Sequence, residues 1–111
     1  MKPTEDIWKY LILMLCESEI ELEAEFCKRR KLGIERYGVP LSAFNGRDAL
    51  VDLKEELLDA VAYNAQAMME QVMPFEEGYD IHTNLLNMLS DVLEQIDKRR
   101  DRFKIDVDKR D

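Results

Sequence analysis

The scarcity of glycine and proline constrains the fold of this 111-residue chain more than any other feature of its sequence. Four glycines and three prolines leave residues 4–32, 47–73 and 79–111 without either breaker. Strand-and-turn architectures need such residues at short intervals, whereas helix interiors exclude them. The sequence therefore predicts an all-α fold in which long helices are joined by few loops.

Three long helices are predicted. The first covers residues 5–31, with Thr4 as its N-cap. The second begins near residues 45–48, where Asn45 and Asp48 have capping-box spacing, and runs to about residue 72. The third begins after Thr83 and runs to about residue 103. Its apolar residues at heptad spacing are Leu85, Leu89, Val92 and Ile96.

These helices are expected to form one helical domain over residues 1–103, followed by a charged tail over residues 104–111 that frays or is disordered. Pro74 and Gly78 are interpreted as breakers in the loop before the third helix, and His82 as a cap or turn residue of that loop. Three helices of this size bury a modest core and leave apolar faces exposed. We therefore expect a bundle of three long helices that is completed by oligomerisation, as a dimer or tetramer.

Charge and hydropathy exclude several classes of partner. The formal net charge of −8 disfavours duplex nucleic acid as a general partner and disfavours anionic membranes. The apolar run at residues 11–16 is too short to span a bilayer. The two cysteines, Cys16 and Cys27, lack zinc-site spacing, so we expect reduced thiols and a cytoplasmic location.

The second helix carries a stripe of acids. Its sequence from Gly46 to Tyr63, GRDALVDLKEELLDAVAY, contains five carboxylates. At about 100° per residue, the side chains of Asp52, Glu56, Asp59 and Tyr63 fall within roughly 60° of one another. No basic residue interrupts this acidic stripe, and most of the remaining circumference is apolar. A hard divalent cation would turn the repulsion between these acids into binding; the alternative is a solvated face.

The first helix supplies a second group of acids. Wound as a helix, Glu17, Glu21 and Glu25 line one side, and Glu19 and Glu23 line another. Only one of these sets can face the second helix. For either set, solvent-exposed charge is the simpler interpretation.

A basic segment lies between the two groups of acids. Residues 28–47 hold six basic residues and a single acid, Glu35. Residues 28–31 can be explained by the dipole at a helix C-terminus, but Arg36 and Arg47 cannot. Arginine suits bidentate recognition of phosphate. An acidic metal stripe beside basic residues is the combination that a nucleoside triphosphate hydrolase needs.

Several segments resemble a known family. ELLDAVAY, Glu56 to Tyr63, is similar to the E-x-x-D segment of the all-α nucleoside triphosphate pyrophosphohydrolases, the MazG-like and dimeric dUTPase-like group. The series ERYGVPL, NGRDALVD and EELLDA also resembles small phage-encoded MazG-like proteins, and together these segments cover roughly residues 28–70. The family's second motif, E-E-x-x-E, is not present on the preceding helix.

The resemblance implies an Mg²⁺-dependent enzyme, with Mn²⁺ as a substitute, that cleaves nucleoside triphosphates to monophosphates and pyrophosphate. Glu56 and Asp59 would be metal ligands, assisted by Asp52 and, in place of the missing motif, by Glu21 and Glu25. Glu55 would orient the attacking water. The substrate-binding residues would be Arg30, Arg36 and Arg47. The alternative is a non-catalytic acidic helical module for protein interaction or self-assembly.

Overall fold

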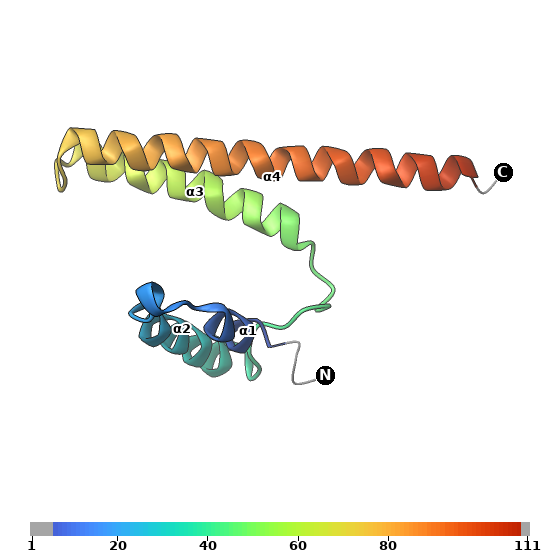
Figure 1. The fold of residues 1–111 in the computed structure, drawn as a ribbon, viewed down its shortest axis with the longest axis horizontal. Helices are drawn as coiled ribbons and strands as arrows, with labels where there is room; N and C mark the ends of the chain where they lie inside the picture. The colour runs from blue at the N-terminus through green and yellow to red at the C-terminus, as the bar shows by residue number, and fades with distance from the viewer. Residues whose placement is uncertain (1–5, 110–111) are drawn as a thin grey trace. The chain divides into compact units, whose positions relative to one another are not determined.

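The described part of the chain is helical. The computed structural model describes residues 6–109, and side chains for residues 6–100. In chain order, the elements are α1 (Ile7–Met14), the short 3₁₀ turn η2 (Glu17–Glu19), α2 (Leu22–Tyr37), α3 (Ala49–Met69) and α4 (Phe75–Lys109) (Figure 1). Residues 6–109 contain no strand, only an isolated antiparallel bridge between Asp6 and Ser42. The predicted all-α class is confirmed, whereas the three-helix bundle and its oligomerisation stay predictions.

Contacts divide the chain into two compact units. Unit 1 is Met1–Arg47 and unit 2 is Asp48–Asp111. The single domain expected over residues 1–103 stays a prediction.

Helix α1 of unit 1 begins at a buried acid. The carboxylate of Asp6 accepts hydrogen bonds from the backbone N–H groups of Trp8 at 3.1 Å and Lys9 at 3.3 Å, which satisfies two free donors of the first turn. Asp6 is only 6% exposed. Thr4, the predicted N-cap, lies outside the described residues, and Asp6 caps α1.

The prediction of one helix over residues 5–31 is wrong, because the chain leaves the helix at Leu15 and Cys16. Both residues have extended backbone angles. Glu19 Oε1 accepts hydrogen bonds from the Cys16 backbone N–H at 3.2 Å and from the Cys16 thiol at 2.7 Å. Both bonds lie within the short turn η2 and its N-cap residue. Such local bonds compete with a continuous helix, and the row of glutamates from Glu17 to Glu25 weakens that helix by like-charge repulsion.

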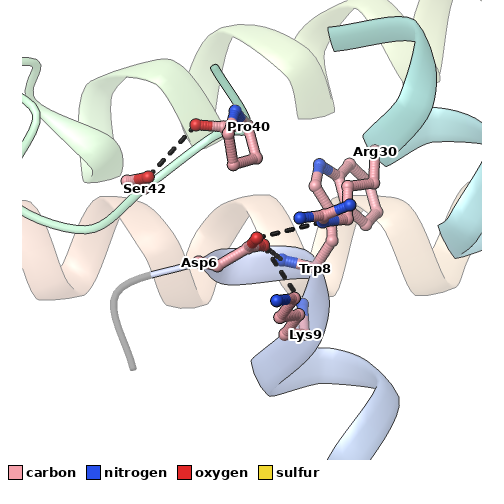
Figure 2. Close-up of polar contacts among 6 residues, drawn as sticks. All are labelled: Asp6, Trp8, Lys9, Arg30, Pro40 and Ser42. Carbon is pink, nitrogen blue, oxygen red and sulfur yellow. Dashed lines mark hydrogen bonds and ion pairs between the residues drawn. The ribbon is translucent and has the colours of Figure 1, made fainter. Parts of the chain in front are cut away.

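Unit 1 is held together at the start of α1. The Nε of Arg30, on α2, donates to Asp6 Oδ2 at 3.0 Å, and the rings of Trp8 and Phe26 are tilted with their centroids 5.7 Å apart. After Gly38 closes α2 at φ 81°, the chain returns to α1, and the Ile7 N–H donates to the Leu41 carbonyl at 3.0 Å. Figure 2 shows the Asp6 carboxylate accepting from Arg30 and from the backbone N–H groups of Trp8 and Lys9.

Helix α3 of unit 2 begins as predicted, but with a different cap. Asp48 is itself the N-cap and accepts from the Val51 N–H at 3.2 Å. Asn45 accepts from the Arg47 N–H at 2.9 Å, so the predicted Asn45/Asp48 capping box is wrong. The helix ends at Met69, three residues before the predicted end, and Gln71 follows in the left-handed region at φ 58°.

The beginning of α4 was predicted about two turns too late. It begins at Phe75, directly after Pro74, so Gly78 and His82 lie inside the helix and not in a loop. Gly78 is needed for close packing, since a Cβ there would lie 2.5 Å from Met68 Cγ. The Asn64 Nδ2 donates to the Gly78 carbonyl at 2.9 Å. At its other end α4 runs to Lys109, through most of the tail predicted to fray.

Helices α3 and α4 form an antiparallel hairpin (Figure 1). The least exposed positions of α4 recur at spacings of three and four residues, which is the pattern of a coiled-coil seam. They are Gly78, His82, Leu85, Leu89, Val92 and Ile96. The predicted heptad stripe is therefore confirmed as the packed side of α4. Among the described residues only Ile96, at 7% exposure, is a buried apolar side chain.

Candidate functional site

The acidic stripe of α3 faces away from its packing partner. The seam side of α3 is centred on Leu57, Val61 and Asn64, and at about 100° per residue the stripe lies roughly 100–160° around the helix from it. Glu56 and Asp59 are exposed, as is Glu55 beside them, whereas Asp52 is half-buried. The four stripe residues thus share one side of α3, as the sequence periodicity predicts.

Asp48, the N-cap residue of α3, stabilises the beginning of that helix. Arg99 of α4 donates its Nη1 to Asp48 Oδ1 at 2.9 Å. This hydrogen bond, with that from the Val51 N–H, holds the pKa of Asp48 below its usual value, and the same bond raises the pKa of Arg99. Sequence analysis missed this pair because it joins residues on two different helices. Asp48 therefore caps α3 and, through its ion pair with Arg99, links the beginning of α3 to α4 at the border of the acidic stripe.

The magnesium prediction depends on the two exposed acids, Glu56 and Asp59. Within residues 6–100 no three side chains from His, Cys, Asp and Glu gather into a preformed cation site. Mg²⁺ does not require such a cage, because it keeps several waters and is often held by one or two carboxylates together with substrate phosphates. Glu56 and Asp59, one turn apart on α3, fit that mode. Magnesium at this stripe stays a prediction.

The two first-helix glutamates predicted as metal ligands lie in unit 1. Glu21 immediately precedes α2 and makes no side-chain capping hydrogen bond. Glu25 lies in the first turn of α2 and accepts from Lys28 Nζ at 3.4 Å, with both side chains largely exposed. Their predicted role at the metal stays a prediction.

The three predicted phosphate-binding arginines differ in their surroundings. Arg30 forms an ion pair with Asp6. This contact gives Arg30 a structural role that the sequence did not predict. Arg36 is exposed in the last turn of α2. Arg47 is also exposed, and its backbone N–H closes the Asn45 turn. Of the three, Arg36 is the side chain best presented for an anionic ligand.

The Asp6–Arg30 pair shifts the titration of the buried acid. Burial by itself would raise the pKa of Asp6. The hydrogen bonds from Arg30 and from the Lys9 N–H, together with the positive charges of both residues, outweigh burial and leave the pKa below its usual value of 3.8. No sequence signal indicated this pair, because its members are 24 positions apart.

Within residues 6–109, no helix combines the length and apolarity that a membrane span requires. Comparisons of the chain with protein-family models, with curated proteins and with solved structures found no match. The resemblance to the MazG-like pyrophosphohydrolases therefore stays a prediction that depends on the motifs quoted above.

Proposed function

We propose that this protein is an Mg²⁺-dependent nucleoside triphosphate pyrophosphohydrolase, which releases the nucleoside monophosphate and pyrophosphate. The observation that supports it best is the exposed pair Glu56 and Asp59. The two acids lie one turn apart on α3, and no basic residue shares their side of the helix. Lys54, the one basic residue of α3, is half-buried on the side nearer the seam.

In this proposal Glu56 and Asp59 hold the metal, with Asp52 beside them. When bound, magnesium would neutralise phosphate charge and lower the pKa of water. Glu55 would orient the attacking water and accept its proton as the bond to the pyrophosphate leaving group breaks. Phosphate binding by Arg36 and Arg47 stays an expectation from the sequence, and Arg30 forms an ion pair with Asp6.

The test is a panel of ribo- and deoxyribonucleoside triphosphates incubated with Mg²⁺, with pyrophosphate as the measured product. Asp59→Asn keeps the side-chain shape but removes a charge, and should reduce turnover at least about a hundredfold. Arg36→Ala should mainly raise KM. Glu23→Gln, an exposed acid of α2, is the matched control and should change little. If folded protein releases no pyrophosphate from any triphosphate, the proposal is wrong.

One observation favours a second candidate function, a module for self-assembly or protein interaction. Apolar side chains remain exposed along the α3–α4 hairpin; they include Leu58, Met69, Phe75, Tyr79, Leu86 and Leu93. Such surfaces in a soluble chain indicate association. A homo-oligomer, as a dimer or tetramer, is therefore proposed for the enzyme as well, and pyrophosphate release distinguishes the two functions.

A further inference from the structure

Helix α4 carries a second row of residues with the same spacings of four and three residues as its seam. Its members, which we call the α4 row, are Tyr79, Thr83, Leu86, Ser90 and Leu93. At about 100° per residue the α4 row lies roughly 100° around the helix from the seam, and all five members are exposed. Tyr79, Leu86 and Leu93 are 55%, 43% and 44% exposed, so α3 leaves much of the α4 row uncovered. A two-helix hairpin needs one seam, whereas each helix of a four-helix bundle packs against two neighbours.

Helix α3 has a matching row on the same side of the hairpin. The same rotation from the seam of α3 leads to Val51, Leu58, Ala62, Ala65 and Met69, with Glu55 at the outer edge of this row. In an antiparallel pair of right-handed helices, equal rotations from the facing sides lead to one side of the pair. Leu58 is 49% exposed and Met69 is 83% exposed. Both helices of the hairpin therefore present apolar side chains on one common side.

The α4 row alternates large and small side chains, and this alternation selects one antiparallel register. If two α4 helices pair about a two-fold axis level with position 88, positions equally far before and after it face each other. Leu86 then faces Ser90 of the second copy, and Leu93 faces Thr83 of the second copy. The Thr83 hydroxyl already donates to the Tyr79 carbonyl at 3.1 Å, so its burial leaves no donor unsatisfied.

The charges along α4 favour the same register. Residues 75–91 hold four acids and no lysine or arginine, whereas residues 98–104 hold five bases and one acid. Parallel α4 helices would bring like charges together, and antiparallel helices bring opposite charges together. In the register that the leucines select, Glu76 faces Arg100 of the second copy. Glu76 makes no ion pair within residues 6–100, and Arg100 reaches Asp97 only at 3.9 Å.

We propose that two copies of this chain associate through this side of the hairpin, with their α4 helices antiparallel, and form a four-helix bundle. An unrelated apolar peptide could cover the leucines. A row whose large and small residues, and whose acids and bases, match the same row in reverse specifies a second copy, because a two-fold interface must be self-complementary. The proposal rests on the homo-oligomer proposed above and assigns its interface, and it does not depend on pyrophosphate release.

The test is sedimentation equilibrium at micromolar concentration, in EDTA so that the result is independent of the magnesium site. Leu86→Arg should at least halve the mass and raise the Kd at least about a hundredfold, because it places two charges in the apolar contact. Met88→Arg is the matched control, since Met88 is 52% exposed and lies on the other side of α4. It should keep the mass of wild type. Circular dichroism of each variant checks that it is folded.

A charge swap tests the register with exposed residues only. Arg100→Glu should raise the Kd about tenfold, because the bundle contains this contact twice and the change replaces attraction with repulsion. Adding Glu76→Arg should restore the Kd to within about threefold of wild type. If it does not, the antiparallel register is wrong.

Two further results would overturn the assignment, and they can be told apart. An oligomer whose mass is unchanged by Leu86→Arg, or reduced by Met88→Arg alone, would refute this interface but not the oligomer. A monomeric wild-type protein would refute both. Neither result bears on pyrophosphate release.

Discussion

Replacing Gly78 with alanine tests whether the close packing of α3 against α4 requires a residue without a Cβ at this position. A Cβ at position 78 would lie 2.5 Å from Met68 Cγ, 3.1 Å from Met68 Sδ and 3.3 Å from Met73 Sδ. Met68 would have to move, and its sulfur would leave the Asn64 amide that lies 3.8 Å away. Overpacking of this kind costs about 1–3 kcal/mol, whereas alanine in place of glycine inside a helix gains about 0.5–1 kcal/mol.

The two effects oppose each other, and the expected net loss is about 1 kcal/mol. For a unit of this size that corresponds to a Tm lower by about 4–8 °C. Urea and thermal unfolding followed by circular dichroism at 222 nm would measure it. Gly33→Ala is the matched control, because Gly33 also lies inside a helix but a Cβ there meets nothing within 4 Å. That change should stabilise the protein by about 0.4–1 kcal/mol.

A double-mutant cycle isolates the contact. In a Met68→Ala background the added methyl group has space, so Gly78→Ala should become neutral or stabilising, with a coupling energy of about 1 kcal/mol or more. If Gly78→Ala stabilises the wild-type protein as much as Gly33→Ala does, the reasoning about close approach is refuted.

Three further outcomes are expected. Millimolar Mg²⁺ should raise the Tm of wild type by mass action, and Glu56→Ala combined with Asp59→Ala should abolish the increase; an equal increase in the double variant would place the ion elsewhere. Asp6 has a lower pKa in the folded state than in the unfolded state, so its contribution to stability is present above about pH 4 and is lost as the pH falls through the folded pKa; the Tm of Asp6→Asn should therefore depend less on pH below 4 than that of wild type. Light scattering at micromolar concentration should give a dimer or tetramer mass, and a monomer mass would contradict the expected oligomer.

The parts of the fold that were predicted correctly follow from local periodicity. The scarcity of glycine and proline predicted the helical class, and the heptad pattern of α4 predicted its packed side. The errors occur where interactions outside a periodic pattern decide the structure. Cys16 and Glu19 break the first helix through their own hydrogen bonds. Gly78 was interpreted as a breaker, although it lies inside α4 where Met68 approaches closely.

The side-chain pairs of the candidate site were the least predictable part. Periodicity places Glu56 and Asp59 on one side of α3, because position around a helix depends only on residue number. It does not reveal that Arg30 reaches Asp6, or that Arg99 reaches Asp48, since these contacts depend on how separate helices pack. One arginine predicted to bind substrate therefore proved to have a structural partner.

Glu56 and Asp59 lack the local ion pairs that some other exposed acids of this chain make. On α4, Glu94 pairs with Lys98 four residues later, and on α2, Glu25 pairs with Lys28 three residues later. These are the i,i+3 and i,i+4 arrangements by which exposed helix faces usually offset their acids. Glu56 and Asp59 have no such partner within residues 6–100, although α3 has a lysine that could have occupied their side. A lysine or arginine on the same side would compete with a cation for these two carboxylates, so the proposed magnesium site relies on that side of α3 carrying no base.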